Sequence, residues 1–484
     1  MHTIIIGNGI VAMSTAFRLA LRAKPNDQIT IVGRKYRPGS ATQAAAAMLN
    51  SFAEIDAGGL DSEIDLFRFE LSHLATRMWP KFEHDIIQAG GPSLPFGCSQ
   101  CQGLSGGGCF SSGTYVINNT AADDLDDANF NAILSALKEF NESHELVTPS
   151  DIPNYMPDKR HRALRAVLIH NEGWINPRLM LEKLDAVLAR FPQVRFVYTH
   201  ATQLLKGGDN LIEAVVTEQG ETLSGDQFLV ATGATTTGLL NESNLGLSIQ
   251  PTFYGVGVSL EIHSPEYPHT NCIRTPNRGL ACGLYSAPYY YEPGRPNDHI
   301  LIGASNYISP TPVPYGRVGS AESLLKGAME QINFNFYRAN LVRVNVGWRP
   351  TSQDTFPLVG KTSITNLTIA TGTKRDGFHM APLLSEVLAA LIHNEPIDER
   401  WMQFKPERQL IRNLSRQEAI DKAVRHQISA AYQHGFTPSK SRMPEQIERM
   451  LRDDLERLHD QVGALDWGIP PEMLDMYRYG HAKP

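Results

Sequence analysis

The fold is decided by a stretch near the start of the sequence, Thr3-Ile4-Ile5-Ile6-Gly7-Asn8-Gly9-Ile10-Val11-Ala12. Its β-branched run is typical of a buried parallel strand, and a turn with two glycines follows at once. A helical pattern then covers residues 11–23, and a second apolar run covers residues 29–32. The order of strand, glycine turn, helix and strand predicts a βαβ unit of the dinucleotide-binding kind.

Each small residue of this turn has a physical task in such a unit. Gly7 permits the tight turn, Gly9 lets the backbone approach a pyrophosphate, and Ala12 allows the helix to pack closely on the strand. The phosphates are expected at the start of the helix, beside Ile10 and Val11, because unpaired N–H groups and the helix dipole favour negative charge there.

The residues after the second strand leave the nucleotide open. An acidic residue normally stands there to bind the ribose hydroxyls, but this sequence has Gly33, Arg34 and Lys35. One reading is a 2′-phosphate ligand and therefore an NADP-linked dehydrogenase. The other is a flavin whose adenine stacks on Arg34.

The next segment, Arg37 to Leu49, is rich in small and hydroxyl-bearing residues, and with Gly7-Asn8-Gly9 it resembles the D-amino acid oxidase superfamily of flavoenzymes, its glycine oxidase branch most closely. Four later segments are similar to the same family: Glu172-Gly173-Trp174-Ile175-Asn176-Pro177-Arg178, Val230 to Ala234, Gly347 to Gly360 and Ala370 to Gly377. The sequence departs from the family pattern at Gly33, at Thr373, where many relatives have histidine, and at Asp376, where they often have asparagine.

The resemblance implies an α/β protein in which a Rossmann-type FAD-binding domain is interlaced with an antiparallel-sheet α+β substrate domain. The expected FAD-binding segments are 1–55, 160–240 and 345–395, the substrate segments are 56–159 and 241–344, and a helical extension covers 396–484. FAD is expected to be bound non-covalently. The expected cofactor contacts are Gly7, Gly9, Ile10, Val11, Ala12, Arg34, Ser40, Ala41, Thr42, Ala46, Met48, Thr202, Thr232, Gly233, Arg349, Arg375, Asp376, Gly377, Phe378 and His379.

A flavin performs the redox chemistry itself, so the protein has to supply a substrate anchor and suitable electrostatics. Arg349 offers the two-pronged guanidinium that fits a carboxylate, and it matches the family's carboxylate-binding position. Arg375 lies in a glycine-rich turn before a helix, where positive potential would favour charge on the flavin pyrimidine. Tyr254 and the tyrosine run Tyr289-Tyr290-Tyr291 are the expected walls of the substrate site. Alternate members of the run would lie on opposite faces of a strand, and Tyr290 is the one expected to face the substrate.

The predicted function is FAD-dependent oxidation of an amine or amino acid by hydride transfer. The resulting imine hydrolyses, and O2 or another electron acceptor reoxidises the flavin. Besides the NADP-linked alternative, a non-catalytic or tailoring flavoprotein whose tail recruits a partner stays open.

The tail beyond residue 404 exceeds the family's common length. Ser415-Arg416-Gln417-Glu418 predicts a capping box that opens a helix. An apolar stripe then predicts a second, heavily charged helix, and its residues are Ile447, Leu451, Leu455, Leu458 and Val462. We expect this pair to pack on the body of the protein; a homodimer arm or a lid is the alternative.

Composition excludes several classes of protein. The 484 residues carry a net charge of −7, which disfavours nucleic acid as a partner. No segment reaches the length of a membrane span, and no signal peptide is recognised. Five cysteines indicate a reducing, cytoplasmic location rather than a disulfide framework. Cys98, Cys101 and Cys109 lack a fourth ligand at zinc-finger spacing, so no metal site is predicted.

Overall fold

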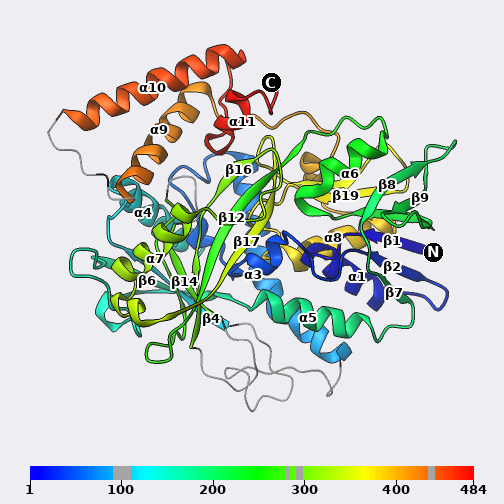
Figure 1. Ribbon diagram of the computed structural model, residues 1–484, viewed down its shortest axis with the longest axis horizontal. Coiled ribbons are helices and arrows are strands. Elements are labelled where there is room, and N and C mark those ends of the chain that lie inside the picture. Colours follow the sequence, from blue (N-terminus) through cyan, green and yellow to red (C-terminus); the bar gives the residue numbers. More distant parts are fainter. Residues whose placement is uncertain (91–110, 279–282, 290–297, 434–435, 437–441) are drawn as a thin grey trace.

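The computed structural model describes residues 1–90, 111–278, 283–289, 298–433, 436 and 442–484. Two sheets dominate it, one on the right of Figure 1 near the N-terminus and a larger one at the centre and left. The helices of the C-terminal extension, coloured orange to red, lie above the larger sheet.

The first sheet has six strands and contains the predicted βαβ unit. Its order is β18-β19-β11-β1-β2-β7, and all neighbours are parallel except β18 and β19. The strands are β1 (His2–Ile6), β2 (Gln28–Val32), β7 (Val194–Val197), β11 (Gln227–Val230), β18 (Leu358–Lys361) and β19 (Leu367–Thr371). A separate three-stranded sheet, in the order β10-β9-β8, consists of β8 (Ala201–Lys206), β9 (Ile212–Thr217) and β10 (Thr222–Ser224).

Helices cover the six-stranded sheet and bury its apolar face in one continuous core. These helices are α1 (Ile10–Arg22), α3 (Glu63–Gly90), α5 (Pro177–Leu188) and α8 (Ala381–Ile392). Ala12 lies fully buried in this core, so the small residue serves helix packing, as its spacing predicts. The predicted βαβ unit and α/β fold are therefore confirmed.

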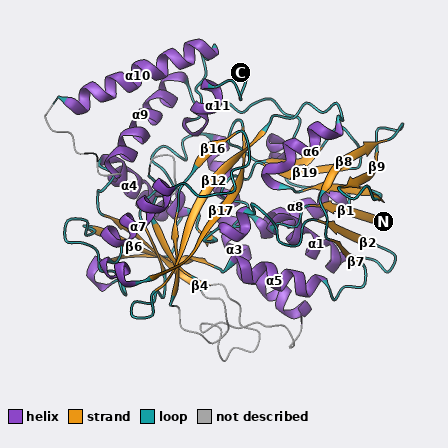
Figure 2. Ribbon diagram, viewed as in Figure 1, coloured by secondary structure: helices purple, strands orange, loops and turns teal. Residues whose placement is uncertain are grey.

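The second sheet has ten strands and is almost entirely antiparallel. Its order is β16-β12-β15-β14-β13-β4-β6-β3, with β17 paired to β12 and β5 paired to β6. The strands are β3 (Met48–Leu49), β4 (Ser111–Asn118), β5 (His144–Val147), β6 (Arg165–Trp174), β12 (Thr252–His263), β13 (Cys272–Arg274), β14 (Tyr285–Pro288), β15 (His299–Gly303), β16 (Tyr307–Ser309) and β17 (Asn340–Ser352). Figure 2 shows its strands in orange to the left of the first sheet.

The chain crosses between the two sheets more often than the expected domain segments suggest. β3, β6 and β17 belong to the ten-stranded sheet, although they fall within or at the edge of segments assigned to the FAD-binding unit. The exact division at 55, 160 and 345 stays a prediction.

The other helices before the C-terminal extension are α2 (Ala41–Ala44), α4 (Asp124–Glu139), α6 (Thr236–Ser243) and α7 (Val318–Gln331), with short 3-10 turns such as η1 (Phe52–Glu54).

The Glu172-to-Arg178 segment joins the two sheets through buried polar contacts. The carboxylate of Glu172 accepts hydrogen bonds from the N–H groups of Ser51, Phe52 and Ala53, and Asn176 caps α5 by accepting from the N–H groups of Arg178 and Leu179. The first set of bonds holds the region after β3 on the end of β6, and the second set fixes the start of α5.

The described part of the extension contains three α-helices, which pack on the body. α9 (Arg416–Gln433) opens with the predicted capping box, because Ser415 and Glu418 exchange hydrogen bonds between side chains and backbone. α10 (Met443–Val462) buries Leu455 and Leu458 in a cluster that also contains Phe253 of β12 and residues of α11 (Leu474–Arg478). Leu451 and Val462 of the predicted stripe pack against the same cluster, whereas Ile447 is not part of it. None of the helices in the described ranges is long and apolar enough to cross a membrane.

Candidate functional site

A cavity of about 790 Å³ lies where the carboxyl ends of the parallel strands face the ten-stranded sheet. Most of the residues predicted to bind the cofactor or substrate line it, although they come from segments far apart in the sequence. These residues are Gly7, Gly9, Ile10, Val11, Arg34, Ser40, Ala41, Thr42, Ala46, Met48, Thr202, Thr232, Gly233, Tyr254, Arg349, Arg375, Asp376, Gly377, Phe378 and His379. Ala12 is the exception, because it lies in the core beneath the cavity, and Tyr290 falls outside the described residues.

The start of α1 forms one end of the cavity and suits an anion. Gly9 is the N-cap, has an extended backbone and offers no side chain of its own to cap the helix. The N–H of Ile10 donates to Thr42 Oγ1 at 3.3 Å, which brings the hydroxyl-rich segment beside the helix start. Uncapped first-turn amides and the helix dipole favour a phosphate at this point.

Two glycines are required by close approaches around this turn. Gly7 has a φ of +116°, and a Cβ there would lie 2.3 Å from the carbonyl oxygen of Ala231. A Cβ on Gly33 would lie 2.5 Å from the Asn8 side chain, which donates to the Arg34 carbonyl. The Asn8 side chain therefore fills the space that the Cβ of an acidic residue at position 33 would need. This explains why the sequence has glycine at position 33, where the family usually has an acidic residue.

Arg34 does not present a free cation for a 2′-phosphate. Its guanidinium pairs with Glu218 at 2.7 Å, and both side chains are partly exposed. The ion pair offsets part of the positive charge on which the NADP-linked reading depended. Arg34 still lines the cavity and remains a candidate contact for the adenine end of a nucleotide.

The Arg37-to-Leu49 segment lies against β17 and narrows the cavity. The N–H of Trp348 donates to the carbonyl of Gly39, and a Cβ on Gly39 would lie 2.2 Å from the Trp348 ring. Ser40 caps the short helix α2 by accepting from the N–H of Gln43. Glycine at 39 is thus needed so that main chain can pass over the indole.

Arg349 projects from β17 into the cavity beside a glycine that makes room for it. A Cβ on Gly257 would lie 2.3 Å from Arg349 Nη1. Nη1 donates to the carbonyl of Ser305 at 3.0 Å and to Asn306 Oδ1 at 3.1 Å. These two bonds hold one side of the guanidinium fork, and the other side carries no hydrogen bond to any described residue. Such a fixed fork suits a carboxylate.

Aromatic side chains form the adjoining wall, and the expected Tyr254 is one of them. Tyr254 of β12 lines the cavity and meets Trp348 edge to face with ring centroids 5.6 Å apart, and burial raises its pKa. Tyr285, which the sequence analysis did not single out, lines it as well. Tyr289 is buried, and its hydroxyl accepts a hydrogen bond from Arg178 Nε at 3.0 Å. The tyrosine run therefore begins in the core rather than in the substrate wall.

The turn after β19 lines the other side of the cavity and is held by ion pairs. Lys374 has a φ of +52°, and its N–H donates to the carbonyl of Pro350 at 2.7 Å. Arg375 lies 3.7 Å from Glu54, and Asp376 pairs with Arg68 at 3.2 Å. Burial works to raise the pKa of Asp376, but the charges of Arg68 and Arg375 outweigh it and hold the pKa below its usual range.

His379 closes this turn as a neutral imidazole. It is buried, its Nε2 lies 2.7 Å from Thr76 Oγ1, and its carbonyl accepts from the Trp79 indole. Burial lowers the pKa of His379 to about 4. Phe378 stacks on Trp79 with centroids 5.1 Å apart, so this end of the turn is anchored on α3.

A second, smaller cavity of about 210 Å³ adjoins the first behind this turn. Glu54 and residues 373–376 line both cavities, while Lys422, His426 and Glu472 of the C-terminal extension line only the second. Glu472 pairs with Lys374 at 2.8 Å. Sequence reasoning missed Lys374 because nothing near it in the sequence indicates its partner in the extension.

Comparison with known proteins agrees with this geometry. A family model described as FAD dependent oxidoreductase matches residues 2–391. The D-amino acid dehydrogenase of Vibrio atlanticus (strain LGP32) is 27% identical over 207 residues, which are 42% of this chain and 46% of that protein. The bifunctional protein ThiO/ThiG of a Nostoc species is 25% identical over 244 residues, which are 48% of this chain and 34% of that protein. The matches span less than half the length of these curated relatives.

Solved structures share the fold over most of the chain. Glycine oxidase from Geobacillus kaustophilus superposes with a TM-score of 0.66 at 18% identity, over 84% of this chain and 99% of that one. Iminodiacetate oxidase from Chelativorans sp. BNC1 superposes with a TM-score of 0.65 at 18% identity, over 84% and 98%. The family model ends before the extension, which begins at residue 396 in our division.

Proposed function

Because this chain belongs to the family of FAD-dependent oxidoreductases, we propose that it oxidises an amine or amino acid at the bond between carbon and nitrogen. The observation that carries the proposal is Arg349, a half-buried guanidinium that lines the cavity and has one side fixed by Ser305 and Asn306. Its other side makes no hydrogen bond to a described residue and would bind a substrate carboxylate. The names of the relatives, a D-amino acid dehydrogenase and a glycine oxidase, support the same class of substrate.

The residues present fit non-covalently bound FAD. The uncapped start of α1 suits the pyrophosphate, and Gly7 and Gly9 keep side chains out of the path of the dinucleotide. Thr42 and Ser40 add hydroxyl groups beside it. At the far end, the turn from Thr373 to His379 offers backbone and the cation of Arg375 toward the flavin ring.

When bound, FAD would supply the redox chemistry, as an acceptor for the hydride from the carbon that bears the amine and a donor of two electrons to O2, which would give hydrogen peroxide. Arg349 would hold the substrate carboxylate, and Tyr254 and Tyr285 would bound the pocket that orients the reacting carbon. The loss of hydride leaves an imine, which takes up water and releases a carbonyl product and ammonia or an amine. His379, being neutral and held by Thr76, serves the position of the turn rather than proton transfer.

The experiment that tests this function is anaerobic reduction of the bound flavin by a panel of amines and amino acids. We expect bleaching of the flavin absorbance by at least one carboxylate-bearing amine. With Arg349→Ala, the apparent dissociation constant for that substrate should rise about 10- to 100-fold, because a charge-assisted pair contributes roughly 1.5–3 kcal/mol. Arg349→Lys should recover part of the loss, since it keeps the charge but not the fork.

Arg338 provides the matched control, because it is an exposed arginine on the 3-10 turn Phe334–Arg338 and does not line the cavity. Arg338→Ala should leave flavin reduction unchanged. Equal reduction by wild type and Arg349→Ala would remove the carboxylate-anchor role. A flavin that no member of the panel reduces would favour the non-catalytic alternative.

A further inference from the structure

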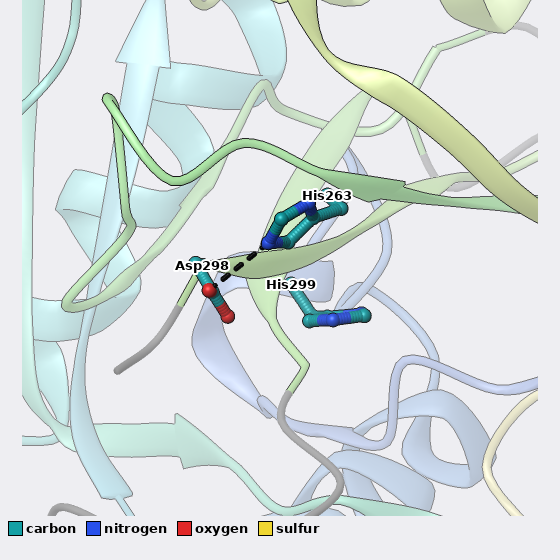
Figure 3. Close-up of side chains that lie close together, drawn as sticks. All are labelled: His263, Asp298 and His299. Atoms are coloured by element: carbon teal, nitrogen blue, oxygen red, sulfur yellow. Dashed lines mark hydrogen bonds and ion pairs between the residues drawn. The ribbon is translucent and has the colours of Figure 1, made fainter. Parts of the chain in front are cut away.

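Two histidines and an aspartate lie close together at the place where β12 ends and β15 begins (Figure 3). His263 ends β12 and His299 begins β15, and the register pairs them directly across the antiparallel strands. Residues opposite one another in this way share a face of the sheet, and the two imidazole centroids are 5.0 Å apart. Asp298 precedes His299, and its Oδ2 lies 3.1 Å from His263 Nε2.

One ligand atom from each of the three residues lies within 4.8 Å of the others. Zinc binds nitrogen and oxygen at about 2.0–2.2 Å in a tetrahedron, which places ligand atoms about 3.4 Å apart. His263 and Asp298 already have that spacing. The upper bound of 4.8 Å is wider than this tetrahedral spacing, so binding would require the three side chains to move closer together, and His263 and His299 are both partly exposed.

A fourth residue orients one of the histidines in the way that metal sites require. Glu261 lies on β12 two residues before His263, so it projects from the same face. Its side chain is fully buried, and its Oε1 lies 2.9 Å from His299 Nδ1. A ligating histidine usually donates its other ring N–H to a carboxylate, which fixes the tautomer. A hydrogen bond donated from Nδ1 to the Glu261 carboxylate would make Nε2 the nitrogen through which His299 binds a metal.

We propose that His263, Asp298 and His299 form a binding site for a divalent transition metal, with Zn²⁺ the ion that fits best. Two imidazoles and one carboxylate are a donor set that suits zinc, and water would fill the fourth position. No metal site was predicted from the sequence, because His263 and His299 are distant along the chain and come together only through strand pairing. The metal would join β12 to β15, and β12 carries Tyr254 and Gly257 of the large cavity.

The test is titration of the full-length, FAD-loaded protein with zinc chloride after removal of metals by chelation, followed by calorimetry and by metal analysis of the dialysed protein. Wild type should bind one equivalent that His263→Ala and His299→Ala each lose or bind at least ten-fold more weakly. Glu261→Gln should weaken binding about 10- to 100-fold, as expected for a residue that orients a ligand. Zinc should also raise the melting temperature of wild type but not that of the ligand variants.

His170→Ala is the matched control, because His170 is an exposed histidine on β6 of the same sheet but outside the cluster. It should bind zinc as wild type does. Asp298→Asn keeps the shape of the side chain, so it tests the site even where an alanine variant loses its flavin and fails to fold. The proposal is overturned when wild type takes up no zinc. It is also overturned when the ligand variants bind as much zinc as wild type does, which is the result expected for zinc held by cysteine thiols.

Discussion

Lys374 and Glu472 form an ion pair of 2.8 Å between the turn that lines the large cavity and the C-terminal extension. Their side chains are only 12% and 16% exposed. Burial lowers the pKa of Lys374, and the charge of Glu472 opposes that shift. The extension, which lies outside the range that the family model matches, thereby helps to hold a turn within it.

Breaking this pair should loosen the turn and weaken FAD binding. Glu472→Gln leaves a buried ammonium beside Arg375 and Arg68, so we expect the free energy of unfolding to fall by about 2 kcal/mol. Thermal unfolding and titration of the apoprotein with FAD measure the two effects. Glu445→Gln, at an exposed glutamate in the first turn of α10, should change neither. Unaltered FAD affinity in Glu472→Gln would show that the extension does not support the cofactor turn.

The two glycines of the first turn should respond differently to alanine. A Cβ at Gly9 meets only Thr42 Oγ1 at 3.7 Å, and the backbone there is extended, so Gly9→Ala should fold normally. Its methyl group would enter the cavity and lower FAD affinity. Gly7→Ala should destabilise the protein itself, because its φ is positive and the methyl group would meet the Ala231 carbonyl. Melting temperatures of the apoproteins separate the two, and equal destabilisation would contradict the assignment.

Local spacing explains what the sequence could predict. Strand β1, the turn at Gly7 and Gly9 and helix α1 follow one another along the chain, so their pattern is visible without knowing the fold. The capping box at Ser415 and Glu418 is equally local, and its reciprocal hydrogen bonds are present. The family resemblance pointed to Arg349 and to the turn after β19 as site residues, and both line the large cavity.

Contacts between distant segments could not be predicted in the same way. Nothing near Lys374 in the sequence points to Glu472, and nothing near His263 points to His299, because their proximity depends on the extension packing and on the β12–β15 register. Tyr289, the first tyrosine of the run expected at the pocket wall, is buried in the core, where Arg178 from another segment donates to its hydroxyl, and Tyr290 lies outside the described residues.

Crowding Arg349 should affect substrates that carry a carboxylate. A Cβ on Gly257 would lie 2.3 Å from Arg349 Nη1, so Gly257→Ala should displace the guanidinium. We expect KM for a carboxylate substrate to rise about 10-fold or more with a smaller change in kcat. Gly319→Ala in α7, where a Cβ meets nothing within 4 Å, is the control and should behave as wild type. An unchanged KM in Gly257→Ala would place the substrate anchor elsewhere.

His379 should make stability depend on pH in the acid range. Burial depresses its pKa from 6.5 to about 4, so the unfolded chain binds a proton between these values and the folded protein does not. The stability is therefore fully present above pH 6.5 and is lost as the pH falls toward 4, by up to about 3 kcal/mol. His379→Gln cannot titrate, so its free energy of unfolding should fall less steeply over the same range. Parallel curves for the two proteins would mean that His379 is already charged in the folded state.

The packing of α10 on the body can be separated from a role as a dimer arm. Leu458 is 2% exposed within the cluster formed by α9, α10, α11 and Phe253, so Leu458→Ala should destabilise the extension by about 2–5 kcal/mol. Met450 lies on the same helix but is 60% exposed, and Met450→Ala should change stability by no more than about 0.5 kcal/mol. Proteolysis of the extension and sedimentation of both variants provide the measurements. Loss of a contact within the chain must loosen the helix that makes it, and therefore expose the extension to protease. A Leu458→Ala protein that changed its oligomeric state but stayed as resistant to protease as wild type would instead show that the stripe is an interface between two copies of the chain.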